Sequence, residues 1–393
     1  MPKVQEPLFY SQVECPICKT TNDYENVKVG SYTESARDTD FCPTGRIWQN
    51  PAYQKYDPLL FFMATCKKCF YTQEFNSEFK NWQKDTAFKT YRLKNVQEKH
   101  LAEFLKEDGL IKFLGSHLDQ GRFPFESAVI KFMLGIYDEK LMERSSKLDL
   151  GRYYLRIGWL FRTNGDQLQG ATAGTTGFLY KLKNTAAAAS QILPNYDARI
   201  NDLKTLLEHD FAMVFTDMPQ AGQLKSQAES VIKEVLLSVT PLKQAGEKLV
   251  DLFDQAEKSL ACSQDTSDGK YFEYATFSDF LLKAKQLWDG VPLSETEALI
   301  KARDYYQSAY ESGDKIAAGA GQIQATYLIA ELSRRTGNYE NANSFFNQVI
   351  RTGRDIVNNR KGDASTINYA KKLLETAMEQ GRLCRKESEG QAK

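Results

Sequence analysis

Residues 325–350 read ATYLIAELSRRTGNYENANSFFNQVI, and the spacing of small and apolar residues in this stretch decides the predicted fold. Ala330 is small enough for two helices to cross closely, and Gly337 permits the tight turn that must follow. Ala342 and Phe346 then begin a second apolar face at helical spacing. The stretch therefore predicts an antiparallel helical hairpin with tetratricopeptide-repeat spacing.

The same periodicity recurs on both sides of this hairpin. The first-helix pattern returns in residues 154–165, and segments 126–137 and 295–310 are candidates for returning helices. Residues 364–383 can close the series. Because repeats bury their apolar faces against neighbouring repeats, we expect three or more stacked hairpins. The chain is therefore predicted to be all-α from about residue 96 onward.

Residues 178–262 interrupt the repeat pattern. Their apolar residues step by three and four, which is heptad spacing. We expect two long helices folded back on each other, each roughly 50–65 Å long at about 1.5 Å per residue. Because such helices exceed one tetratricopeptide pair, we expect the hairpin to project as an arm for a partner protein or for self-association. The alternative is a hairpin packed onto the repeats.

Two pairs of cysteines near the N-terminus indicate a metal site. They lie in the runs Cys15-Pro16-Ile17-Cys18 and Cys66-Lys67-Lys68-Cys69. Each run, called a cysteine knuckle below, can place two thiolates on one metal from a tight turn. Four thiolates are a common ligand set for structural zinc. We therefore predict that Cys15, Cys18, Cys66 and Cys69 hold one zinc ion, with iron in an all-thiolate site as the alternative. A site of four sulfurs leaves no open position for water or substrate.

Other interpretations of the cysteines stay open. The four thiols could be buried without a metal, since free cysteine is common inside proteins. A redox site at Cys15 and Cys18 would need a following helix to lower a thiol pKa, but residues 19–23 (KTTND) are typical of a turn. Cys42 either neighbours the metal site or is simply buried.

Composition argues against a general affinity for nucleic acid. Lys plus Arg and Asp plus Glu both number 51, so the formal net charge is zero, and binding to a polyanion would need a local patch. Aromatic residues near the knuckles could stack on bases, but we expect them to form the core of a small metal module. They are Tyr53, Tyr56, Phe61, Phe62, Phe70, Tyr71, Phe75, Phe79 and Trp82.

The sequence also favours a cytoplasmic, non-enzymatic protein. The first 15 residues contain no apolar leader segment, and the longest uncharged apolar run, 59–66, is far shorter than the roughly 20 residues of a membrane helix. His100, His117 and His209 lie in no recognisable catalytic motif, and the carboxylates form no acid/base pair that the sequence identifies.

The predicted architecture is mainly α, with a zinc-ribbon-like α+β module at the N-terminus and a long helical-hairpin insertion. The predicted domains are a metal module (1–95), a helical repeat-like region (96–177), the heptad-patterned hairpin (178–262), a tetratricopeptide-like region (263–383) and a polar tail (384–393).

Several ordered blocks resemble the bacterial domain-of-unknown-function family 2225. Besides the two cysteine knuckles, they are residues 37–43 (RDTDFCP), 57–60 (DPLL) and 327–340 (YLIAELSRRTGNYE). The resemblance covers about residues 10–165 and 290–355. It implies a cysteine-knuckle module joined to tetratricopeptide-like helices, and it implies no activity. The heptad region is longer than the resemblance leads us to expect.

These observations predict a zinc-stabilised scaffold that binds protein partners through its helices. Helices that begin repeat-like pairs usually line the concave side of such arrays, and four residues on or near them are predicted to bind a partner: Tyr154, Phe161, Tyr327 and Arg334. The alternatives are a zinc-ribbon regulator that contacts nucleic acid and a thiol-based redox or metal-responsive protein.

Overall fold

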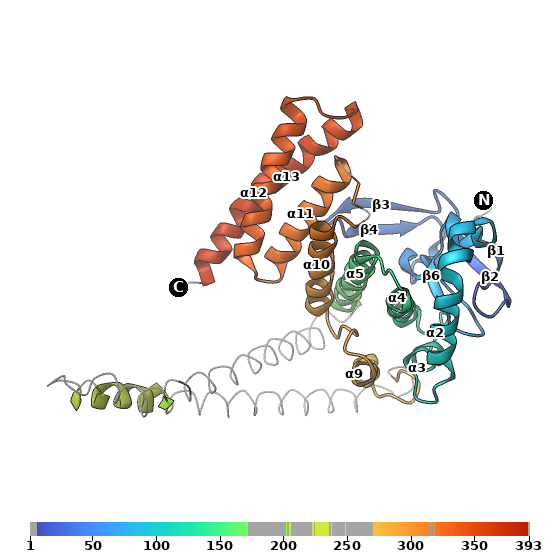
Figure 1. Ribbon diagram of the computed structural model, residues 1–393, viewed down its shortest axis with the longest axis horizontal. Helices are drawn as coiled ribbons and strands as arrows, with labels where there is room; N and C mark the ends of the chain where they lie inside the picture. Colours follow the sequence, from blue (N-terminus) through green and yellow to red (C-terminus); the bar gives the residue numbers. More distant parts are fainter. Residues whose placement is uncertain are drawn as a thin grey trace. The chain divides into compact units, whose positions relative to one another are not determined.

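The computed structural model describes residues 6–171 and 270–391, except 315 and 318, together with scattered positions between 202 and 248 (Figure 1). The chain divides into two compact units, one of Met1–Asn164 with Lys270–Lys393 and one of Gly165–Gly269. The predicted hairpin at 178–262 falls within the second unit and, apart from those scattered positions, lies outside the described residues. Its geometry, projection and self-association stay predictions.

The N-terminal part of the first unit contains three antiparallel strand pairs. They are β1 (Leu8–Glu14) with β2 (Thr21–Val27), β3 (Tyr32–Arg37) with β4 (Pro43–Trp48), and β5 (Met63–Thr65) with β6 (Thr72–Glu74). Two short 3₁₀ turns, Pro51–Tyr53 and Pro58–Phe61, follow β4. Each begins with a proline, and the side chain of the preceding Asn50 or Asp57 accepts a backbone hydrogen bond. The chain between the cysteine knuckles is therefore partly strand, as the α+β prediction required.

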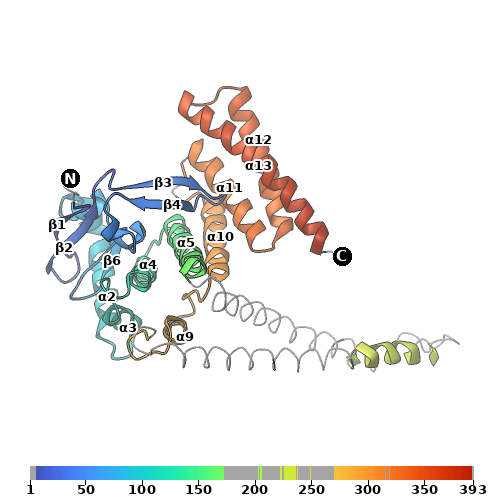
Figure 2. The same ribbon diagram turned by 180° about the vertical axis from the view of Figure 1, so that it is seen from behind.

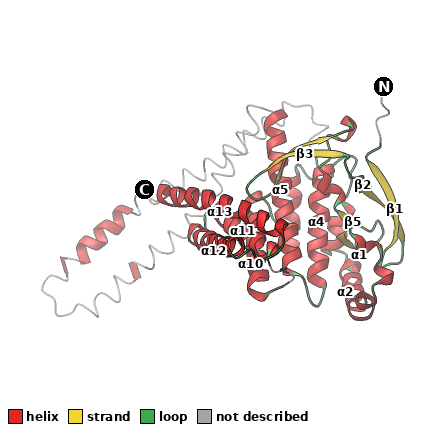
Figure 3. Ribbon diagram, turned by 90° about the horizontal axis from the view of Figure 1, so that it is seen from above, coloured by secondary structure: helices red, strands yellow, loops and turns green. Residues whose placement is uncertain are grey.

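Helices form the rest of the first unit (Figure 3). From the N-terminal side they are α1 (Ser77–Lys80), a 3₁₀ turn (Trp82–Lys84), a π-helical turn (Phe88–Arg92), α2 (Leu93–Leu105), α3 (Leu110–Ser116), α4 (Pro124–Leu141) and α5 (Lys147–Ala171), whose residues from Gly165 onward belong to the second unit. After it they are α9 (Phe277–Leu287), α10 (Glu295–Ser312), α11 (Ala320–Arg335), α12 (Tyr339–Asn358) and α13 (Ala364–Gln391). The prediction of a mainly α protein with an N-terminal α+β module is confirmed.

Helices α11 and α12 form the predicted helical hairpin. Gly337 lies between them with a φ of 76°, the left-handed conformation that glycine adopts without strain. The side chain of Asn338 accepts from the Asn341 N–H and caps α12. Ala330 and Ala342 are both fully buried, as expected of small residues where two helices cross.

Helix α5 packs against α10, although more than 120 residues separate their N-termini. A Cβ at Gly158 would lie 2.7 Å from a methyl carbon of Leu299, so the two helices approach as closely as glycine allows. The rings of Tyr154 and Tyr305 stack at 5.6 Å. The repeat-like helix that begins at residue 154 therefore finds its partner after the second unit rather than immediately after itself.

None of the helices among the described residues is both long enough and apolar enough to cross a membrane.

Candidate metal centre

The two cysteine knuckles are built in the same way. Each lies in the turn of an antiparallel strand pair, Cys15 and Cys18 between β1 and β2, and Cys66 and Cys69 between β5 and β6. In each turn the first cysteine donates its N–H to the carbonyl five residues later, at 2.9 Å in both cases. The residue after each second cysteine has a left-handed backbone, with φ near 60°. Two turns of the same geometry thus present four sulfurs.

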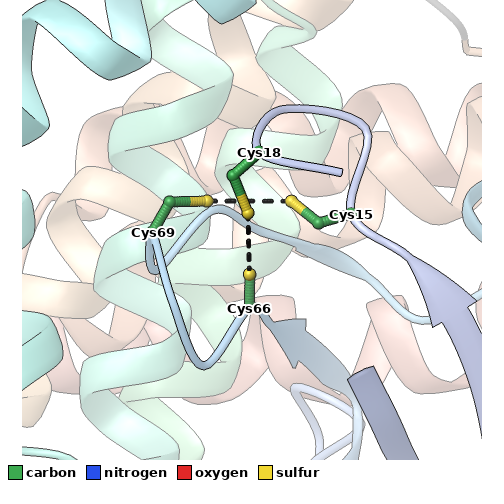
Figure 4. A group of neighbouring side chains, drawn as sticks. All are labelled: Cys15, Cys18, Cys66 and Cys69. Carbon is green, nitrogen blue, oxygen red and sulfur yellow. Dashed lines mark hydrogen bonds between the residues drawn. The ribbon is translucent and has the colours of Figure 1, made fainter. Parts of the chain in front are cut away.

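The four sulfurs point toward one another (Figure 4). Cys15 Sγ lies 3.7 Å from Cys69 Sγ, and Cys18 Sγ lies 3.5 Å from Cys66 Sγ. All four atoms lie within 4.8 Å of one another. Four sulfurs placed about 2.3 Å from one metal at the corners of a tetrahedron would be about 3.8 Å apart. The cluster therefore has the size and ligand chemistry to hold one metal ion.

The cluster is buried, and this affects its protonation. Cys15, Cys66 and Cys69 are at most 1% exposed, and Cys18 is partly buried. Hydrogen bonds among the thiols, with burial adding to them, raise the pKa of Cys15 and of Cys69. Hydrogen bonds from the neighbouring thiols lower the pKa of Cys66. Four adjacent thiols cannot all ionise here unless a cation compensates their charge, which is what a bound metal supplies.

Asn22 supports the second knuckle from the first hairpin. Its side chain is buried, and its Nδ2 donates to Thr20 O at 2.9 Å and to Cys66 Sγ at 3.4 Å. Its Oδ1 accepts from the Lys67 N–H at 2.9 Å. A single amide thus links the two knuckles beside the sulfurs. Sequence reasoning missed this residue, because an asparagine after a turn is common.

Helix α2 forms a hydrogen bond to the backbone of each knuckle. Gln97 Nε2 donates to Ile17 O at 2.8 Å, and His100 Nε2 donates to Cys69 O at 2.9 Å. Residues three apart share one face of a helix, so one turn of α2 contacts both knuckles. Sequence reasoning treated His100 as one of three histidines without a motif, and its spacing from Gln97 was the available signal.

His100 and Asp138 connect the knuckle to helix α4. Both side chains are buried, and His100 Nδ1 lies 2.6 Å from Asp138 Oδ1. The other oxygen of Asp138 accepts from the Thr72 N–H at 2.7 Å. Burial opposes charge on both groups, but the nearby carboxylate raises the pKa of His100. Burial raises the pKa of Asp138. One proton therefore lies between the two side chains, and the pair fixes β6 and the second knuckle against α4.

Aromatic residues close the metal site from solvent. Tyr71 is fully buried, its ring meets that of His100 edge to face, and Phe79 and Trp82 are each less than 10% exposed. Trp82 Nε1 donates to Glu14 O at 2.7 Å, just before the first knuckle. These aromatics form a core, as expected, and are not exposed for stacking on bases. The first knuckle leads into strand β2, so no helix N-terminus follows Cys18 to activate a thiol.

Cys42 lies outside the four-sulfur cluster. It is 2% exposed, and burial raises its pKa to about 12. Of the two interpretations offered for this residue, simple burial is therefore the one that the structure supports.

The loop after β3 carries a buried ion pair. Asp40 is fully buried, and Arg162 on α5 donates to both of its carboxylate oxygens, at 2.9 and 2.7 Å. Arg162 also donates to Asp38 and to Glu295, at 2.9 and 2.7 Å. Burial would lower the pKa of Arg162, but its hydrogen bonds to Asp40 outweigh burial and raise it. This two-point contact fixes the loop to α5.

The same loop meets helix α11, which lies nearly 300 residues later (Figure 2). Arg335 donates to Asp38 Oδ1 and to Thr39 Oγ1, both at 2.7 Å. Thr39 Oγ1 donates to Glu331 Oε1 at 2.5 Å. The two sequence blocks at opposite ends of the chain, 37–43 and 327–340, are thus parts of one network of contacts.

Of the four residues predicted to bind a partner, two are core residues. Tyr154 is 1% exposed and donates its hydroxyl to Gly290 O at 2.8 Å. Tyr327 is fully buried and donates to Thr39 O at 2.9 Å. The structure corrects the expectation that these two line an accessible surface, because their rings pack in the core and their hydroxyls already have partners.

The other two residues are partly accessible. Phe161 is half-buried against Phe125. Arg334 is paired with Glu331 and with Glu387 at 2.8 Å, so it joins α11 to α13. The structure does not bring the four residues into one site, and a partner-binding role for Phe161 and Arg334 stays a prediction.

Residues 8–196 and 279–377 match the sequence model of DUF2225, described as an uncharacterized protein conserved in bacteria. Neither the curated proteins nor the solved structures give a match to the chain. The matched segments contain both knuckles, the loop 38–40 with its buried Asp40, and the helical hairpin α11–α12, which are the features that the structure joins. The chain belongs to the bacterial family DUF2225.

Proposed function

We propose that this protein is a non-catalytic adaptor in which a structural zinc ion holds the N-terminal module and the helices α10–α13 bind a partner protein. The observation that carries this proposal is the closed set of four thiols. Sulfur separations of 3.5 and 3.7 Å are close to the edge of a tetrahedron around one metal. A metal held by four sulfurs has no free position for water or substrate, so its role is structural.

Zinc is the metal that this role favours. It has no accessible redox states, and its tetrahedral four-thiolate sites are among the commonest structural metal sites. Iron has the same ligand preference in an all-sulfur site and would give the protein a visible absorption band. Supporting contacts from Asn22, Gln97 and His100 fix the knuckles themselves, which suits a metal that stabilises a fold.

The helices α10–α13, called the helical array below, form the proposed partner-binding surface. Helix α10 packs on α11, α11 on α12, and α12 on α13, so each helix contacts its neighbour in sequence. Arrays of this kind present extended surfaces to peptides and helices. The Arg334–Glu387 pair joins α11 to α13, which makes the surface rigid and lowers the entropic cost of binding. The segment 178–262 is proposed as a second contact, for a partner or for another copy of the chain.

We propose that the protein acts as an adaptor in the cytoplasm. A reducing compartment keeps cysteines as thiols, and the proposed zinc site requires all four of its thiols. The buried aromatic residues of the metal module favour the adaptor over the alternative of a nucleic-acid regulator, because base stacking needs exposed rings.

Capture experiments with the full chain test the adaptor proposal. The bait would be wild type, a double charge reversal on the exposed side of α12 (R351E with R354E), a control reversal on α9 (K283E), or a chain whose residues 178–262 are replaced by a Gly/Ser bridge. We expect a specific partner to be retained by wild type and K283E and lost with the α12 variant or the deletion. Identical captures by all four baits would contradict the proposal.

A further inference from the structure

A cavity of about 730 Å³ lies between α5, α10, α11, α13 and the loop that follows β3. Its volume is typical of sites that bind small molecules. Its apolar wall is formed by Leu148, Leu155, Trp159, Ile316, Leu328 and Leu373. The cavity belongs entirely to the first unit and lies away from the cysteine cluster, so neither the metal site nor the proposed adaptor role assigns it an occupant.

One cationic side chain of the lining, Arg156, has an aromatic partner but no hydrogen-bond or ion-pair partner among the described residues. Arg156 lies on α5 and is partly exposed at the wall of the cavity. Its guanidinium carbon lies 3.9 Å from the centre of the Phe62 ring. Stacking of this kind engages the face of the guanidinium and leaves its N–H edge unsatisfied. The carboxylate of Glu74 acts on Arg156 without forming an ion pair with it, so an anion in the cavity could supply a direct partner for the guanidinium.

The other ionisable residues that line the cavity are more often cationic than acidic, so they add to the positive charge of Arg156. The ionisable side chains of the lining are Arg37, Arg152, Arg156, Lys372, Tyr306, Tyr369 and a single carboxylate, Asp38. Asp38 is already held by Arg162 and Arg335, at 2.9 and 2.7 Å. Burial raises the pKa of Tyr306 to about 12, so its hydroxyl keeps its proton at neutral pH and can donate.

The ligand chemistry follows from these groups. We propose that the cavity binds a small organic carboxylate, whose apolar body lies between α5, α11 and α13 and whose carboxylate pairs with Arg156. The two oxygens of a carboxylate can accept hydrogen bonds from the N–H edge of one guanidinium, and one of them can also accept from the Tyr306 hydroxyl. A phosphate would need more donors, and Arg152 is already engaged by Asp149 at 2.9 Å. The apolar wall excludes water from the pair and strengthens it.

Calorimetric titration of the full chain with octanoate, 1-octanol and octylamine tests this inference. These probes share one apolar body and differ in the charge of the head group. We expect octanoate to bind and to raise the Tm, and the neutral and cationic probes to bind at least about tenfold more weakly. Substituting Arg156→Met should weaken octanoate binding by about tenfold or more, while Arg156→Lys should retain part of the affinity.

A matched control separates ligand binding from a structural role of Arg156. Arg122 also stacks on a phenylalanine, Phe123 at 4.8 Å, but it is exposed, so R122M should leave octanoate affinity unchanged. Without ligand, R156M should keep or raise the Tm, because it removes a charge without an ion-pair partner. Equal binding of octanoate and 1-octanol, or octanoate binding that R156M leaves intact, would overturn the proposal. If the wild-type chain binds no octanoate and R156M lowers the Tm, Arg156 has a structural role, and the proposal is overturned as well.

Discussion

The metal module and the helical array of the first unit are stabilised in different ways. The module is made of two-stranded sheets with strands of three to seven residues, which are marginal on their own. Its core is organised around four thiols. The array uses helices of 16 residues or more, whose apolar faces bury one another. With the proposed zinc ion, we therefore expect the stability of the module to depend on a bound metal, and that of the array to depend on the packing of its side chains.

Removing the metal should destabilise the module far more than the array, and this is the largest effect that we expect. Structural zinc contributes roughly 10–16 kcal/mol in small modules, so Cys66→Ser should release the metal and unfold the N-terminal module. Far-ultraviolet circular dichroism should retain most of its helical signal, while the fluorescence of the buried Trp82 should shift toward that of exposed tryptophan. Cys42→Ser is the control, since Cys42 is equally buried but lies outside the cluster. Loss of metal from the control, or retention by Cys66→Ser, would contradict the assignment.

Breaking the ion pair between Asp40 and Arg162 should have the next largest effect, and it should affect both regions together. Arg162→Met leaves the fully buried Asp40 without its two-point partner, and such a change costs about 3–5 kcal/mol. Chemical denaturation should show the loss. Arg303→Met removes a surface pair with the exposed Asp304 and should cost less than about 1 kcal/mol. If the two variants are equally stable, the loop does not join the regions.

The link between His100 and Asp138 should affect the module more than the array. His100→Gln can keep the hydrogen bond to Cys69 O but leaves Asp138 buried without its partner, at a cost of about 3 kcal/mol. We expect faster transfer of zinc to a chelator, measured with a colorimetric zinc dye. His117→Gln changes a buried histidine whose ring nitrogens contact Phe113 O and Glu273 instead of a knuckle, and it serves as the comparison. Identical transfer rates would show that His100 does not support the knuckle.

Overpacking the α11–α12 crossing should give the smallest effect, confined to the array. Ala330 is fully buried, so Ala330→Leu forces the two helices apart at a cost of about 1–3 kcal/mol. Thermal melting should detect the change, and zinc content should remain at one per chain. A loss of zinc in this variant would mean that the two regions are not stabilised separately.

The sequence predicted the parts of this protein better than their connections. The knuckles and the α11–α12 hairpin follow from local spacing, because a C-x-x-C turn or a crossing of small residues is specified within a few positions. Tyr154 and Tyr327 were misplaced because helical periodicity shows which residues share a face but not which face is buried. The contacts of Asp38 with Arg335 and of His100 with Cys69 join positions far apart in the chain, and local spacing does not show which distant residues meet.

The four thiolates of Cys15, Cys18, Cys66 and Cys69 are proposed to close around one structural zinc ion. X-ray absorption at the zinc edge, on the full chain as purified, tests it directly. We expect about one zinc per chain with four sulfur neighbours at about 2.3 Å and no oxygen or nitrogen neighbour. A chain without metal, or a zinc ion with fewer than four sulfurs and a light-atom ligand, would contradict it.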